Sequence, residues 1–125
     1  MKEKIGCFED LIVWQKSHEF VLLIYKITKS FPSEERFGLI SQIRRAVVSI
    51  SANIAEGFKR RGIKDKINFY NISQSSLTEV HNYVILAKDL EYIDQKSLEA
   101  IKPYIIEIGK MLNGLVSATE GKPTF

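Results

Sequence analysis

The stretch from Gly38 to Arg61 carries the clearest periodic pattern in the chain and places the tightest constraint on its fold. Branched aliphatic residues recur there at intervals of three and four, as Ile40, Ile43, Val47, Ile50 and Ile54. This spacing puts their side chains on one face of an α-helix, which would be the face that packs into a core. Small side chains lie beside this apolar stripe, so a second helix can approach it closely. The pattern therefore predicts a long core helix.

The two ends of this helix are marked by residues with strong positional preferences. Pro32 interrupts the preceding pattern, because proline in a helix interior removes a backbone hydrogen bond, and Ser33 is a suitable cap for the next helix. The helix is predicted over residues 34–56, with a short turn before it as the alternative, because Gly38 interrupts its start. Gly57 is expected to end it, since glycine readily takes the left-handed conformation that closes a helix.

Three further segments have helical periodicity, at residues 8–30, 64–90 and 95–118. Asp94 is expected to cap the last of these helices by accepting a hydrogen bond from a backbone amide of its first turn. Pro103 lies inside the same segment, so we expect either a kink or a later start of that helix. No segment shows the strict alternation of a half-buried strand.

These patterns predict an all-α protein. Four helices joined by short links are antiparallel to their neighbours in sequence, so we predict an up-down-up-down antiparallel four-helix bundle that forms a single domain over residues 1–125. The first and third helices each carry two apolar stripes, which is more than packing inside one small bundle requires. We therefore expect another subunit to cover part of that surface.

Composition narrows the class of protein further. No run of about 18 apolar residues occurs and the first residues lack an apolar signal core, so we expect neither a membrane span nor secretion. Cys7 is the single cysteine, which excludes an internal disulfide and fits a reducing cytoplasm. Residues 36–66 hold eight basic and two acidic side chains, a net charge of +6, whereas the rest of the chain carries −3. Such a cationic region favours an anionic partner.

Seven basic side chains of this region are candidate nucleic-acid contacts: Arg44, Arg45, Lys59, Arg60, Arg61, Lys64 and Lys66. Clustered lysine and arginine side chains bind phosphate oxygens without regard to base sequence and with a strong dependence on salt. The alternative for the cluster that begins at Lys59 is a solvated surface without a partner. The alternative for Arg44 and Arg45 is a structural role, in which they pair with acidic groups of another helix or subunit.

A structural polar network is predicted beside the apolar stripe of the long helix. Arg45, Ser49, Asn53 and Glu56 share one face of that helix by their spacing. Glu56 lies near the helix C-terminus, where the helix dipole disfavours negative charge. A cationic neighbour would offset this effect, and both Arg45 and Arg60 are within reach.

The chain offers no recognisable catalytic constellation. A glycine-rich phosphate loop, a nucleophile elbow and a paired set of catalytic acids cannot be placed. His18 and His81 lack the Glu-x-x-His spacing that bundle proteins use to bind metals. We therefore expect no catalytic residues, no metal, no cofactor and no enzymatic activity.

Several segments together carry a family resemblance. They are FEDL at 8–11, VWQK at 13–16, QIRRAVVSI at 42–50 and NIAEG at 53–57. With these motifs the chain resembles the 23S rRNA-intervening sequence protein family, also called the four helix bundle protein family, over about residues 8–116. The chain departs from the family pattern at Ser51, where proline is usual, and at Ser75, where glycine is frequent.

The resemblance implies a small helical protein that assembles as a ring, commonly a homopentamer. It also implies a relation to the accessory variability determinant proteins of diversity-generating retroelements, which are partners of reverse transcriptase with a basic ring surface. We expect a non-enzymatic oligomer that binds nucleic acid, with RNA preferred to DNA. The alternatives are a protein-interaction scaffold, such as a reverse-transcriptase accessory subunit, and a structural protein whose basic patch meets acidic residues of its own neighbours.

Overall fold

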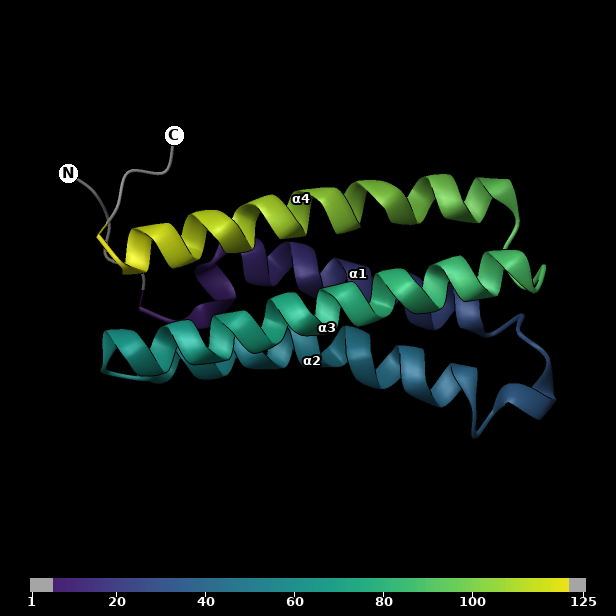
Figure 1. Ribbon diagram of the computed structural model, residues 1–125, viewed down its shortest axis with the longest axis horizontal. Coiled ribbons are helices and arrows are strands. Elements are labelled where there is room, and N and C mark those ends of the chain that lie inside the picture. Colours follow the sequence, from purple (N-terminus) through teal and green to yellow (C-terminus); the bar gives the residue numbers. More distant parts are fainter. Residues whose placement is uncertain (1–5, 122–125) are drawn as a thin grey trace.

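The computed structural model describes residues 6–121, and within that range it contains four α-helices and no strand (Figure 1). The elements are η1 (Phe8–Asp10), α1 (Ile12–Thr28), η2 (Ser33–Glu35), α2 (Leu39–Lys59), α3 (Ile63–Asp89) and α4 (Gln95–Thr119). The four α-helices lie side by side and reverse direction at each short link, as a four-helix bundle requires (Figure 1). The all-helical prediction is therefore confirmed. None of the described helices is long and apolar enough to cross a membrane.

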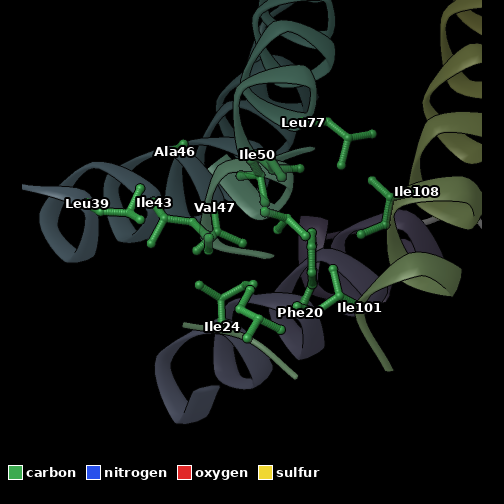
Figure 2. Close-up of a cluster of buried hydrophobic side chains, with 14 of the residues drawn as sticks. Phe20, Ile24, Leu39, Ile43, Ala46, Val47, Ile50, Leu77, Ile101 and Ile108 are labelled. Carbon is green, nitrogen blue, oxygen red and sulfur yellow. The ribbon is translucent and has the colours of Figure 1, made fainter. Parts of the chain in front are cut away.

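The core is built from hydrophobic side chains contributed by every α-helix. Phe20 and Ile24 of α1, Ile50 of α2 and Ile108 of α4 belong to one cluster of buried side chains (Figure 2). All four are completely buried. Burying a side chain of this size contributes about 1.5–3 kcal/mol, so the long apolar stripe of α2 is a main source of the stability of the fold. This helix runs through the core as its periodicity predicts.

The backbones of α2 and α3 share a more extensive contact than those of any other helix pair in the described chain. Gly57 lies on this contact. A Cβ atom at Gly57 would be only 2.6 Å from the Cε1 atom of Tyr70 and 3.1 Å from the Cβ atom of Phe69. The prediction that Gly57 ends the helix is wrong, because α2 continues to Lys59 and Gly57 is helical. The absence of a side chain at this position serves the close approach of α3 instead.

The first turn of α2 also differs from its prediction. Ser33 opens the short 3-10 turn η2 and makes no capping hydrogen bond with its side chain, so the predicted start at residue 34 is wrong. The alternative of a short turn before the helix is confirmed, since α2 begins at Leu39. Glu35 takes the capping role, because its Oε1 atom accepts a hydrogen bond from the Leu39 backbone N–H at 3.2 Å. Its Oε2 atom accepts one from the hydroxyl group of Tyr92 at 3.0 Å, which ties this turn to the segment between α3 and α4.

The ends of α1 and α4 show what periodicity leaves undetermined. Residues 8–10 form a 3-10 turn, so α1 begins at Ile12 and not at residue 8. The cap predicted for α4 is present, since the Oδ1 atom of Asp94 accepts a hydrogen bond from the backbone N–H of Ser97 at 2.8 Å. The predicted start at residue 95 is correct, and the alternative of a later start is excluded, because α4 begins at Gln95 and continues through Pro103. Pro103 is exposed, so its ring removes one backbone hydrogen bond without displacing a core side chain.

Candidate nucleic-acid interface

The seven predicted basic contacts do not form one continuous surface. Arg44 and Arg45 lie in the first half of α2, whereas the other five lie at the turn between α2 and α3. At 1.5 Å per residue, Arg44 and Lys59 are about 22 Å apart along the helix axis. The two groups must therefore be judged separately, by what each side chain already contacts.

Arg44 is occupied within its own subunit. Its Nε atom donates a hydrogen bond to the hydroxyl oxygen of Thr28 at 2.9 Å, and Nη2 donates one to the backbone carbonyl of Tyr25 at 3.2 Å. The guanidinium group also lies 4.4 Å from the centre of the Tyr25 ring. A cation here neutralises the partial negative charge at the C-terminus of α1. The geometry gives Arg44 a structural role, with hydroxyl and carbonyl partners in place of the acidic ones considered from the sequence.

The predicted polar network forms only in part. The Nδ2 atom of Asn53 donates hydrogen bonds to the backbone oxygen of Ser49 at 2.9 Å and to its Oγ atom at 3.0 Å. Ser76 of α3, which sequence reasoning did not single out, donates to the same Oγ atom at 2.8 Å. Arg45 lines a hollow beside Ser49, but it has no hydrogen bond or ion pair within residues 6–121. Glu56 also lies outside this network.

Two of the five cations at the turn between α2 and α3 hold the turn together. The Nη2 atom of Arg60 lies 2.7 Å from a carboxylate oxygen of Glu56, and its guanidinium group lies 4.6 Å from the centre of the Phe69 ring. The Nζ atom of Lys66 donates hydrogen bonds to the backbone carbonyls of Phe58 at 2.7 Å and of Gly57 at 3.3 Å. Lys66 therefore satisfies the carbonyl group of Phe58, which the end of α2 leaves without a backbone partner, whereas the Gly57 carbonyl also accepts the Arg60 backbone N–H at 3.2 Å.

The remaining three cations of the turn are exposed and have no partner in the described part of the chain. They are Lys59, Arg61 and Lys64, which we call the hairpin cations. Lys64 also lines a shallow hollow with Asp65, Asn68 and Asn71 near the start of α3. The backbone N–H groups at the start of α3 face the same end of the molecule, where the helix dipole favours an anion. This end of the bundle combines free positive charge with hydrogen-bond donors.

The pKa shifts of the titratable groups arise from contacts that stabilise the fold. The hydrogen bond to Glu35 raises the pKa of Tyr92, and burial raises the pKa values of Tyr70 and of Tyr104. Hydrogen bonding to Ser97 lowers the pKa of Asp94. Residues 6–121 contain no group of three side chains that could hold a metal ion.

One surface feature was missed from the sequence. A groove of about 740 Å³ runs along the outer side of α2, and we call it the α2 groove. Its lining includes Tyr25, Arg36, Phe37, Arg44, Arg45 and Val48. Phe37 is 87% exposed, although it is one of the largest apolar residues in the chain. The sequence does contain one indication of this groove, because Phe37 is an aromatic residue in the polar turn between two helices and belongs to no periodic core pattern.

Comparisons with known proteins agree with this fold. The chain resembles the crystal structure of a protein of unknown function from the S23 ribosomal protein family of Bacteroides thetaiotaomicron VPI-5482. The sequences are 32% identical, the match covers 84% of this chain and 98% of the other, and the TM-score is 0.77. No curated protein matches the chain. The family model of the 23S rRNA-intervening sequence protein matches residues 9–114, and the chain therefore belongs to that family.

Proposed function

We propose that this protein is a non-enzymatic, oligomeric nucleic-acid-binding protein of the cytoplasm that prefers RNA to DNA. The observation that carries the proposal is the set of hairpin cations. Lys59, Arg61 and Lys64 are exposed and have no partner among residues 6–121, whereas Arg44, Arg60 and Lys66 are engaged in stabilising the fold. Unpaired cations on a rigid helical turn can neutralise phosphate charge without first breaking an internal contact. The contact is expected to be independent of base sequence.

The oligomer is part of the same proposal. Several large apolar side chains remain exposed on one copy of the chain, among them Ile12 at 68%, Leu22 at 59% and Phe37 at 87%. Large exposed apolar side chains in one small domain support burial against further copies. We propose a ring, with a homopentamer as the expected size. Repetition of the hairpin cations in each subunit would turn weak single contacts into useful avidity.

Replacement of the hairpin cations tests this proposal. The triple variant Lys59→Ala, Arg61→Ala and Lys64→Ala should keep the fold, because none of these side chains has a partner in the part of the chain that the structure describes. It should weaken RNA binding about equally for unrelated sequences. The matched control replaces Lys96, Lys102 and Lys110 of α4, which are also exposed, and removes the same charge from another surface. Equal losses in both variants would mean that net charge, and not the turn between α2 and α3, governs binding.

A protein-interaction scaffold, such as an accessory subunit of a reverse transcriptase, is the second candidate. The α2 groove favours it, because an exposed apolar surface with arginine side chains suits a protein partner. The two candidates differ in which substitution abolishes the interaction. Replacement of Phe37 by alanine should weaken capture of such a partner and leave the hairpin cations in place. A reverse-transcriptase gene beside the gene of this protein would favour this candidate.

A further inference from the structure

Arg60 is held in place on several sides at the turn between α2 and α3. Its backbone N–H donates a hydrogen bond to the Gly57 carbonyl at 3.2 Å, and its Nη2 atom lies 2.7 Å from a carboxylate oxygen of Glu56. The guanidinium group lies over the ring of Phe69, at 4.6 Å from the ring centre. These contacts fix the main chain and two sides of the guanidinium group. The Arg60 side chain is nevertheless 42% exposed, so the protein does not enclose it.

A guanidinium group held in this way suits the base of a nucleotide. The group is planar, delocalised and weakly hydrated, so it stacks on flat rings in addition to binding phosphate. Unpaired bases of RNA stack on arginine and aromatic side chains, whereas the bases of a duplex are already stacked on their neighbours. Because Glu56 and Phe69 restrain Arg60 before any ligand arrives, little side-chain entropy is lost when a base stacks on it.

The cations beside Arg60 supply contacts for the phosphates of the same strand. Lys59 and Arg61 are its neighbours in sequence, and both are exposed with no partner among residues 6–121. A base on Arg60 therefore lies between two side chains that can neutralise the phosphates on either side of it. Cations that follow the backbone, next to a group on which bases stack, are the combination that binds single strands without regard to sequence.

The positive charge at this end of the bundle is local. Residues 56–66 carry five cations and two carboxylates, a net charge of +3. Three further carboxylates lie at the same end, in η1 and after α4 (Figure 1): Glu9, Asp10 and Glu120. A duplex is stiff and presents its phosphates over a broad face, whereas a single strand bends to follow a few adjacent cations. The small size of the cationic patch therefore favours a single strand.

We propose that the turn between α2 and α3 binds single-stranded RNA, with one unpaired base stacked on the guanidinium group of Arg60 and the flanking phosphates bound by Lys59 and Arg61. This inference rests on the nucleic-acid binding proposed above and identifies the form of the nucleic acid. Arg60 has two roles, because it stabilises the turn through Glu56 and Phe69 and also offers its remaining surface to a base. Duplex RNA makes the phosphate contacts alone.

Three RNA ligands test the proposal: a single strand of about twelve nucleotides, an abasic ribose–phosphate strand of the same length, and the same single strand annealed to its complement. The abasic strand keeps every phosphate and lacks every base, so the ratio of the two dissociation constants measures the contribution of the bases. Arg60→Lys keeps the charge and loses the planar group, whereas the matched control Lys59→Ala loses a phosphate contact. Fluorescence anisotropy measures binding, and thermal unfolding by circular dichroism checks that each variant is folded.

The unmodified protein should bind the ordinary single strand about tenfold more tightly than the abasic strand, and more tightly than the duplex. Arg60→Lys should remove most of the difference between the ordinary and abasic strands, because lysine has no planar group on which a base can stack. Lys59→Ala should weaken binding of both strands by the same factor, because both keep their phosphates.

Three results would count against these assignments. Equal binding of the ordinary and abasic strands by the unmodified protein, or tighter binding of the duplex, would overturn the inference and leave phosphate binding at the hairpin cations standing. An undiminished difference between the two strands in Arg60→Lys would place the stacked base on another residue and overturn the role of Arg60. Absence of binding to all three ligands would refute the proposed function itself.

Discussion

Replacement of Gly57 by alanine tests the packing of α2 against α3. The new Cβ atom would lie 2.6 Å from Cε1 and 2.9 Å from Cδ1 of Tyr70, distances at which something must move. Tyr70 is 2% exposed and its ring is enclosed by the core, so it cannot swing into solvent. Overpacking of this kind typically costs about 1–3 kcal/mol. The higher helix propensity of alanine offsets about 0.5–1 kcal/mol of this destabilisation.

The net expectation for Gly57→Ala is a loss of about 1–2 kcal/mol in the free energy of unfolding. For a chain of this length that loss lowers the Tm by about 4–8 °C. Urea denaturation followed by circular dichroism measures it. Gly114→Ala is the matched control, because Gly114 is also helical and nothing lies within 4 Å of the point where its Cβ atom would be. The control should be neutral or slightly stabilising. If Gly57→Ala behaved like Gly114→Ala, the close approach of α3 would not be the reason for glycine at this position.

Three further predictions concern contacts at the helix ends and tyrosine side chains with raised pKa values. Arg44→Ala should destabilise the protein by about 1.5–3 kcal/mol in urea denaturation, because the hydrogen bonds to Thr28 and Tyr25 are lost. Arg44→Lys should recover only part of that stability, since lysine lacks the guanidinium group that makes both bonds. Asp94→Ala should lower the Tm at neutral pH, because it removes the cap of α4. The pKa of Asp94 is lowered in the folded state, so the difference in Tm between the two proteins should be complete above the ordinary value of 3.8. It should vanish as pH falls through the folded pKa. The raised pKa values of Tyr70, Tyr92 and Tyr104 predict a pH dependence of stability with the opposite sign, so stability should be lost as pH rises above 10. The Tm measured from pH 8 to 11 should fall less steeply for Tyr92→Phe than for the unmodified protein.

The helices were predictable because each one carries a periodic apolar face of sufficient length. Ile43, Ile50 and Ile54 of α2 are fully buried, as their spacing predicts. The helix ends were less predictable, because they depend on contacts between segments distant in sequence. Gly57 is an ordinary terminator by local rules, and only the position of Tyr70 on α3 shows that it lies in a tight helix contact.

The candidate site was predictable in composition and not in detail. The positive charge around residues 59–66 is evident in the sequence. Which of these cations are free is a matter of three-dimensional contacts, since Lys66 reaches back to the end of α2 and Arg60 pairs one turn back with Glu56. Phe37 could not be assigned a role from periodicity, because it lies in the link before α2 and belongs to no stripe.

Salt dependence of RNA binding tests the central proposal most directly. The association constant of the unmodified protein with a structured ribosomal RNA fragment, an unrelated RNA and duplex DNA is measured across a series of salt concentrations. We expect binding that weakens steeply with salt and a preference for RNA. In the Lys59, Arg61 and Lys64 triple variant, the logarithmic slope should be smaller by about two to three for each subunit in contact with the nucleic acid. Absence of binding at low salt, or a slope unchanged in the triple variant, would contradict a nucleic-acid interface at the hairpin cations.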